Sequence, residues 1–206
     1  METPKPALST PIDTISYSLG VSIGKNLKQQ GFDTLNIDML AKAFNDVFKN
    51  NTLLVKPEEA NQLLSKYFQE KQAEKQGKNS KESEKFLEEN KKKPGVVTLP
   101  SGLQYQVIKE GTGPQPKETD KVTTHYHGTL IDGTVFDSSV DRGQPASFPV
   151  NGVIPGWVEA LQLMKVGSKW KLFVPSKLAY GERGAGENIG PNTALVFEVE
   201  LISIDK

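Results

Sequence analysis

Residues 122–139 read VTTHYHGTLIDGTVFDSS, and this stretch determines the fold class expected for the second half of the chain. Val122, Thr124 and Tyr126 recur at the two-residue period of a β-strand that has one buried face. The Asp-Gly pair at 132–133 lies between apolar residues, which is a strong signal for a tight hairpin turn. The stretch therefore predicts two antiparallel strands joined by a short turn.

The same alternation recurs in the rest of the second half. It is present in three further groups of residues, which are Leu103, Tyr105 and Val107; Trp170, Leu172 and Val174; and Leu195, Phe197, Val199 and Leu201. Residues 155–161, PGWVEAL, are compatible with one short helix. These patterns predict an α+β domain in which an antiparallel sheet packs on a single helix.

The first half is predicted to be helical. Apolar residues recur at three- and four-residue steps in residues 12–27 and again in residues 39–48. Gly31 lies where the C-terminal cap of the first helix is expected. Pro57, followed by two glutamates, is typical of the first turn of a third helix.

We expect three parts: an all-α dimerisation domain at residues 1–68, a polar linker helix at residues 69–93 and the α+β domain at residues 94–206. The last part holds 14 of the 18 glycines, which is typical of short strands with many loops. The middle part holds 14 charged residues out of 25, so a helix there would be solvated on nearly all sides. A disordered linker is the alternative, because Gly77 and the Asn-Ser pair at 79–80 weaken the helical pattern.

Dimerisation of the helical part is expected from its size. About 60 residues bury too little apolar surface to form a good core alone. Packing of these helices against the second half of the same chain is the alternative. A polar spacer of about 25 residues between the two halves argues against that alternative.

Composition excludes several classes of function. Lys+Arg and Asp+Glu both number 25, so the net charge favours neither nucleic acid nor an anionic membrane as a partner. The chain has no cysteine, which excludes disulfides, thiol catalysis and cysteine metal sites. The sequence contains no run of about 18 apolar residues, so no transmembrane segment is predicted. The start of the sequence lacks the pattern of a signal peptide, and its prolines before Ile12 resemble a tether after a removed export signal.

Conventional catalytic motifs are not found in the sequence: there is no nucleophile elbow, Walker loop or dinucleotide fingerprint. His125 and His127 would point to the same face of a strand, so a metal pair is conceivable. No acidic or cysteine ligand lies nearby in a recognised spacing. We therefore expect no metal and no cofactor, and interpret the histidines as surface or hydrogen-bonded strand residues.

Aromatic residues at strand ends and in loops are the most informative feature. They are Tyr126, Phe136, Phe148, Trp157, Tyr180 and Phe197. Aromatic side chains also build cores, which is the alternative interpretation and is expected for Phe197 in any case. Phe136 follows a turn, however, and Tyr180 opens a glycine-rich loop. Large aromatic residues at such places often line a pocket.

A family resemblance extends over roughly residues 95–205. Five segments resemble FKBP-type peptidyl-prolyl cis-trans isomerases in order and spacing: residues 122–128, 130–139, 153–157, 178–181 and 193–201. Residues 16–20, SYSLG, and the polar third helix resemble the dimerising arm of the macrophage infectivity potentiator branch. The resemblance implies a twisted antiparallel sheet of about five strands wrapped on one short helix. It also implies rotation of the bond before proline as the activity, together with a chaperone function.

The resemblance implies a pocket between the sheet and the helix. Its substrate-binding residues would be Tyr126, Phe136, Asp137, Arg142, Phe148, Val153, Ile154, Trp157, Tyr180, Ile189 and Phe197, of which Tyr180, Asp137, Phe136 and Trp157 are the expected catalytic residues. Trp157 would form the floor under the proline ring. Tyr180 would donate its hydroxyl to a substrate carbonyl, and Ile154 would offer its backbone N–H. Arg142 would pair with Asp137.

The resemblance also implies the partners. These are proline-containing peptides, unfolded proteins, macrolide inhibitors of the rapamycin type and a second copy bound through residues 1–68. A module that binds proline-containing chains without turnover is the alternative function. Proteins with this kind of arm occur in the bacterial cytoplasm and in the cell envelope, and the proline-containing start favours the periplasm or envelope, with the cytoplasm as the alternative.

Overall fold

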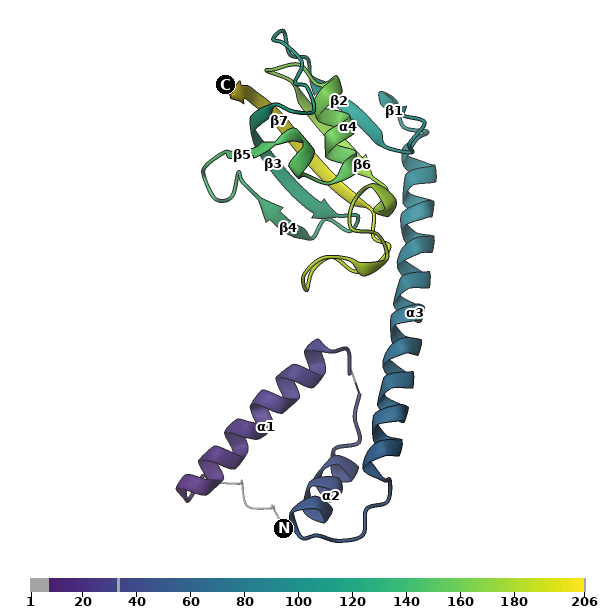
Figure 1. The fold of residues 1–206 in the computed structure, drawn as a ribbon, viewed down its shortest axis with the longest axis vertical. Helices are drawn as coiled ribbons and strands as arrows, with labels where there is room; N and C mark the ends of the chain where they lie inside the picture. Colours follow the sequence, from purple (N-terminus) through teal and green to yellow (C-terminus); the bar gives the residue numbers. More distant parts are fainter. Residues whose placement is uncertain (1–7, 33, 206) are drawn as a thin grey trace, which may run out of the picture. The chain divides into compact units, whose positions relative to one another are not determined.

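The computed structural model describes residues 8–32 and 34–205 (Figure 1). Most of the predicted tether lies in residues 1–7, outside the described residues. The chain divides into two compact units, Met1–Gln62 and Leu63–Lys206, which are described separately below. Among the described residues, no helix is both long enough and apolar enough to cross a membrane.

Helix α1, Pro11–Gln29, ends just before Gly31, where its sequence predicts a C-terminal cap, and begins after Thr10. Thr10 and Asp13 form a capping box, in which each side chain accepts a hydrogen bond from the other residue's backbone N–H. Past its last turn, the Gly31 N–H donates to the carbonyl of Lys28 at 3.1 Å. This bond satisfies one of the carbonyls that a helix end leaves without an internal partner.

The first unit leaves its apolar residues exposed. Helix α2, Ile37–Phe48, follows α1, and Asp46 is the only buried residue among residues 8–32 and 34–62. Exposed large apolar side chains of this unit include Ile12, Ile15, Leu19, Ile37, Met39, Phe44, Val47, Phe48 and Leu54. An apolar surface of this extent is typical of an interface between proteins.

Helix α3, Pro57–Asn90, is continuous for 34 residues, and confirms the predicted long linking helix. It runs through Gly77 without a break, so the disordered alternative does not describe this segment as far as Asn90. Exposed i,i+4 and i,i+3 ion pairs lie along it, including Lys66–Glu70 and Lys71–Glu74. Such solvent-exposed pairs contribute little to stability, because water and salt screen the charges.

The second unit contains one antiparallel sheet, which confirms the predicted α+β fold class. Its strands are β1 Val96–Thr98, β2 Gln104–Lys109, β3 Lys121–Leu130, β4 Val135–Ser138, β5 Ala146–Pro149, β6 Lys169–Val174 and β7 Leu195–Asp205. The order is β1-β2-β6-β7-β3-β4, with β5 also paired to β3. The resemblance implied about five strands, whereas the sheet has seven. The additional pairing includes β1 and β5, which are too short to show an alternating pattern in the sequence.

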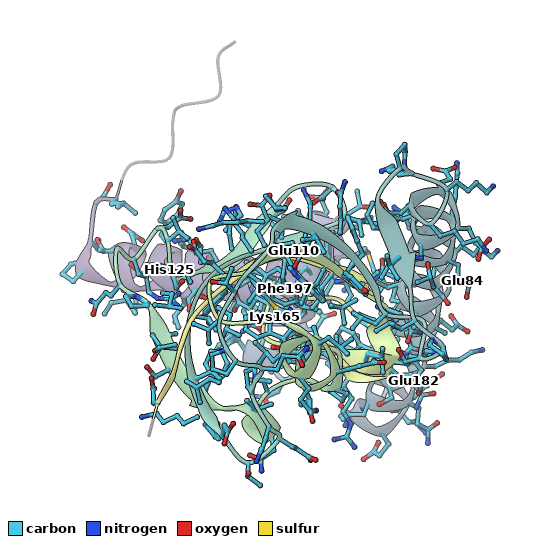
Figure 2. The ribbon with its side chains drawn as sticks, turned by 90° about the horizontal axis from the view of Figure 1, so that it is seen from above. Glu84, Glu110, His125, Lys165, Glu182 and Phe197 are labelled. Atoms are coloured by element: carbon cyan, nitrogen blue, oxygen red, sulfur yellow. The ribbon has the colours of Figure 1, made fainter. Side chains whose placement is uncertain are left out.

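Helix α4, Pro155–Leu163, packs on one face of this sheet and buries Trp157, Ala160 and Leu161 (Figure 1). The alternating residues of β6 and β7 supply the opposite side of the core, with Leu172, Val174, Leu195, Phe197, Val199 and Leu201 all buried. Figure 2 shows Phe197 in the middle of this domain, whereas Glu84 of α3 lies at its edge.

Candidate active site

An aromatic cage surrounds Trp157, the residue that α4 presents to the sheet. The indole is buried, with 4% of its surface exposed. The centroids of the Tyr126, Phe148 and Phe197 rings lie 5.4, 5.6 and 5.2 Å from it, all in edge-on arrangements. Such edge-to-face packing is favourable between aromatic rings, so the cage is a rigid apolar surface.

This cage forms the base of a cavity of about 430 Å³. The cavity is lined by Tyr126, Phe136, Asp137, Phe148, Gly152, Val153, Ile154, Trp157, Tyr180 and Phe197. Its volume is within the range of small-molecule and peptide side-chain sites. All but two of the predicted substrate-binding residues contribute to the lining, whereas Gly152 was not predicted. Only its position directly before the VIPGW segment could have indicated that residue.

The two predicted residues outside the lining are Arg142 and Ile189. Arg142 contacts the cavity only through Tyr126 and Asp137. Ile189 is 7% exposed and belongs to the hydrophobic core. Its backbone pairs with Ala185 through two hydrogen bonds of 2.8 and 3.1 Å. The Ile189 side chain therefore supports the loop that contains Ala185 and Ile189 from the core side, and it does not form a pocket wall.

Phe136 reaches the cavity because Gly128 leaves room for its ring. Gly128 on β3 pairs with Asp137 on β4, one residue away from the phenylalanine. A Cβ atom at Gly128 would lie 2.8 Å from the tip of the Phe136 ring and 3.0 Å from the Phe197 ring. A larger residue at this position would displace both rings from the cavity.

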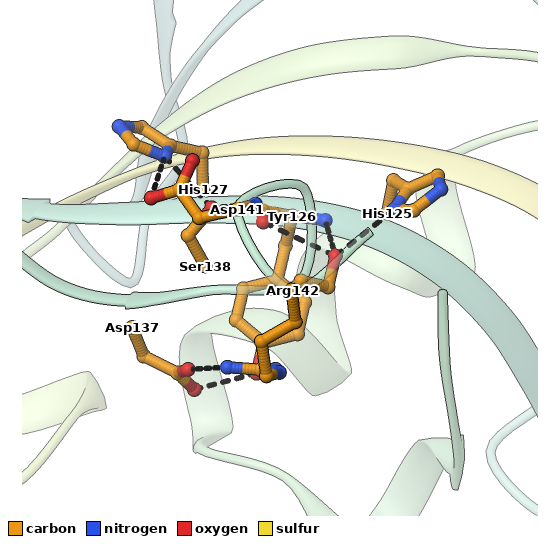
Figure 3. Close-up of polar contacts among 8 residues, drawn as sticks. His125, Tyr126, His127, Asp137, Ser138, Asp141 and Arg142 are labelled. Atoms are coloured by element: carbon orange, nitrogen blue, oxygen red, sulfur yellow. Dashed lines mark hydrogen bonds and ion pairs between the residues drawn. The ribbon is translucent and has the colours of Figure 1, made fainter. Parts of the chain in front are cut away.

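A polar network forms one edge of the cavity (Figure 3). The Tyr126 hydroxyl donates to the Asp137 carboxylate at 2.5 Å and accepts from the Arg142 guanidinium at 2.8 Å. Arg142 also pairs directly with the other oxygen of Asp137. The three groups form a closed ring of charge-assisted hydrogen bonds, which fixes the position of each one.

These contacts shift the pKa values of the Asp137 carboxyl and the Tyr126 phenol. Partial burial of Asp137 opposes its ionisation, but the hydrogen bonds from Tyr126 and Arg142 and the charge of Arg142 outweigh it and lower the carboxyl pKa. Burial and the hydrogen bond to Asp137 raise the pKa of the Tyr126 phenol. Near neutral pH the edge of the cavity therefore carries an ionised carboxylate beside a neutral phenol.

Besides the buried indole N–H of Trp157, two hydrogen-bond donors in the lining have no protein partner among the described residues. One is the Tyr180 hydroxyl, on a side chain that is 40% exposed, and the other is the backbone N–H of Ile154. Both could donate to the carbonyl groups of a bound peptide. The lining contains no serine, cysteine, lysine or histidine. The aromatic walls can therefore bind an apolar ring, and the donors can orient a carbonyl group.

The two histidines each contact a serine of the neighbouring segment. His125 Nδ1 lies 3.1 Å from Ser139 Oγ, and His127 Nδ1 lies 3.0 Å from Ser138 Oγ (Figure 3). Within residues 8–32 and 34–205, no group of three or more histidine or acidic residues is placed to hold a metal ion.

Each half of the chain matches the model of a known protein family. Residues 113–202 match the model of the FKBP-type peptidyl-prolyl cis-trans isomerase domain. Residues 12–107 match the model of the domain amino terminal to FKBP-type peptidyl-prolyl isomerase.

Individual proteins are similar over almost the whole chain. The outer membrane protein MIP of Legionella longbeachae is 49% identical over 97% of this chain and 88% of its own length. The FKBP-type 22 kDa peptidyl-prolyl cis-trans isomerase of Escherichia coli K12 is 48% identical over 96% of this chain and 100% of its own. The crystal structure of FkpA from Escherichia coli has a TM-score of 0.76 at 37% identity, covering 97% of this chain and 99% of the other.

Proposed function

This chain belongs to the family of FKBP-type peptidyl-prolyl cis-trans isomerases, and we propose that its isomerase site is the aromatic cavity between α4 and the sheet. The enzyme accelerates rotation about the peptide bond that precedes proline. The observation that carries the proposal is the composition of the lining. It combines a buried tryptophan with two donors, from Tyr180 and Ile154, for which the described part of the chain offers no partner.

The reaction makes no new covalent bond and moves no proton. Its barrier of about 18–20 kcal/mol is the loss of amide resonance as the C–N bond twists. Without a catalyst, the exchange takes about tens to hundreds of seconds. A catalyst need only bind the twisted amide more tightly than the planar one.

The cavity can provide this difference in binding. Trp157 would hold the proline ring, while the carbonyl before it turns within reach of the Tyr180 hydroxyl. The twisted amide is less dipolar than the planar amide, so an apolar aromatic wall disfavours the planar state more. Asp137, held by Tyr126 and Arg142, would keep the cavity edge fixed.

The cis-to-trans rate of a short Leu-Pro peptide, with and without rapamycin, tests this assignment. Acceleration that rapamycin removes would support an open working cavity and inhibition by macrolides of this type. Binding of the peptide without acceleration would contradict the proposed site and leave the binding module as the function of the cavity.

Tyr180→Phe is expected to lower kcat/KM on this peptide by about two- to tenfold, because one hydrogen bond contributes a net ~0.5–1.5 kcal/mol. Tyr105→Phe is the matched control, since Tyr105 stacks on Trp170 and does not line the cavity. Equal rates for wild type and Tyr180→Phe would remove this hydroxyl from the mechanism.

We also propose that residues 1–68 form a homodimer and that the two cavities act together on unfolded proteins. The support is the exposed apolar surface of the first unit, where Ile12 is 65% and Phe48 82% exposed. A second apolar hollow of about 380 Å³, lined by residues that include Met39, Val47 and Leu54, lies in the same unit. Two linked cavities bind one long chain with a raised effective concentration, which suits a chaperone.

Light scattering is expected to give twice the chain mass for the whole protein and one chain mass for residues 63–206, the second compact unit. In the refolding of a protein limited by proline isomerisation, the whole chain is expected to exceed this fragment by about tenfold or more, because the second site adds avidity. Both should act equally on a short peptide. A monomeric whole chain would contradict the dimer, and equal refolding rates would contradict the chaperone role.

For the location we propose the periplasm or the cell envelope. The support is the name of one relative, which describes that Legionella protein as an outer membrane protein. Fractionation of the producing bacterium tests this assignment, and recovery with cytoplasmic markers would contradict it.

A further inference from the structure

The loop that follows Tyr180 is hydrogen-bonded to helix α3. This loop, residues 181–194, connects Tyr180 to β7 (Figure 1). Its two ends meet where the Asn192 N–H donates to the Gly181 carbonyl at 2.8 Å. Gly181 is bonded to Tyr180, so this contact fixes the backbone from which the tyrosine side chain extends.

Ser83 of α3 fastens the closing end of the loop. Its hydroxyl donates to the Asn192 carbonyl at 3.0 Å and accepts from the Ala194 N–H at 2.8 Å. Ser83 is 5% exposed and Ala194 is fully buried, so these bonds are shielded from water. A short path of contacts therefore leads from Ser83 through Asn192 and Gly181 to Tyr180.

Asn79 holds the loop one helical turn earlier. Residues four apart lie on the same face of a helix, so Asn79 and Ser83 point toward the same segment. The Asn79 amide donates to the Pro191 carbonyl at 2.8 Å and to Thr193 Oγ1 at 3.3 Å. A Cβ atom at Gly190 would lie 2.8 Å from this amide nitrogen, so a larger residue there would displace the Asn79 side chain.

The same face of α3 is fixed to the sheet further along. The Asn90 amide donates to Gln104 Oε1 at 2.9 Å, and the Gln104 amide donates to the Leu87 carbonyl at 2.9 Å. The helix therefore provides a support that is anchored at its own end. All of these contacts lie within the second compact unit.

We propose that Ser83 and Asn79 are positioning residues of the isomerase site, which hold the 181–194 loop and, through it, Tyr180 at the cavity. The proposal rests on the proposed role of Tyr180. That side chain needs such support, because its hydroxyl has no protein partner among the described residues and no hydrogen bond of its own holds it at the cavity. A catalytic donor loses efficiency when its position varies by even about 1 Å.

The test is a double-mutant cycle in the full chain, with Ser83→Ala, Tyr180→Phe and the pair. Ser83→Ala is expected to lower kcat/KM on a short peptide by about three- to tenfold, since the donor is less well placed. Tyr180→Phe should then cost less in the Ser83→Ala background than in wild type, because the two residues act on the same step. Ser80→Ala is the matched control, since the Ser80 hydroxyl donates to Glu84 on the same helix and bonds to no loop residue that the structure describes.

Amide hydrogen exchange separates the loop contact from the role of Tyr180. The Asn192 N–H should exchange about tenfold faster in Ser83→Ala than in wild type or Ser80→Ala, because its local opening becomes easier. Asn79→Ala, which leaves the Ala194 N–H bonded, should show the same changes to a smaller degree with less risk to folding.

The outcomes are distinct. The proposal would be overturned if Ser83→Ala left the exchange of the Asn192 N–H or the kcat/KM unchanged. It would also be overturned if Tyr180→Phe lowered kcat/KM by the same factor in the wild-type and Ser83→Ala backgrounds. If Tyr180→Phe has no effect even in wild type, the proposed role of Tyr180 fails, and the positioning role fails with it. Faster Asn192 exchange in Ser83→Ala would in that case still establish the contact of α3 with the loop.

Discussion

Replacing Trp157 by leucine is expected to remove most isomerase activity while the chain still folds. Leucine keeps an apolar side chain under α4 but loses the ring on which the proline would lie. Burial of a proline-sized ring contributes about 1.5–3 kcal/mol, which corresponds to about a ten- to hundredfold fall in kcat/KM. The measurement is the cis-to-trans rate of a Leu-Pro peptide, taken well below the unfolding midpoint.

The chain contains a matched control for this change. Trp170 is 5% exposed and equally part of the core, but it stacks on Tyr105 at 4.3 Å and does not line the cavity. Truncation of a large core residue costs about 3–5 kcal/mol, so both tryptophan variants should unfold at lower temperature. Only Trp157→Leu should lose activity in the folded state. A similar loss in Trp170→Leu would mean that activity follows stability and not the cavity floor.

Asp137→Asn is expected to lower kcat/KM by about tenfold or more, because hydrogen bonds to charged groups contribute about 1.5–3 kcal/mol. The amide fits the same space but leaves Arg142 without its counter-ion and gives Tyr126 a weaker acceptor. Asp141→Asn is the control, since this neighbouring carboxylate is 63% exposed and does not line the cavity. Wild-type activity in Asp137→Asn would show that the charge of the network has no role.

Asp137→Asn is also expected to change how the stability of the chain depends on pH. Because the folded-state pKa of Asp137 is lowered from 3.8, its ionised form stabilises the folded chain above that value. This contribution is lost as the pH falls through the lower, folded-state pKa. The difference in unfolding midpoint between wild type and Asp137→Asn should therefore stay constant well above pH 3.8 and shrink as the pH falls below it. A difference that stayed constant there as well would contradict the lowered pKa.

Local patterns in the sequence were sufficient for most of the secondary structure. The alternation at Trp170–Val174 and Leu195–Leu201 predicts β6 and β7, since apolar residues at every second position face one side of a strand. Gly31 predicts the C-terminal end of α1 for the same local reason. The cavity residues came from family motifs, and physical patterning alone left open whether the aromatic residues line a pocket or fill a core.

The sequence by itself thus determined most of the elements, the fold class and most of the cavity lining, because each of these is encoded in neighbouring residues or in matched motifs. Only the tertiary structure placed Ile189 in the core and brought Asn79 and Ser83 of α3 against the loop after Tyr180. Those polar side chains resemble any solvated helix face in the sequence. Their partners are backbone groups more than 100 residues away, and hydrogen bonds at such separation leave no periodic signal in the sequence.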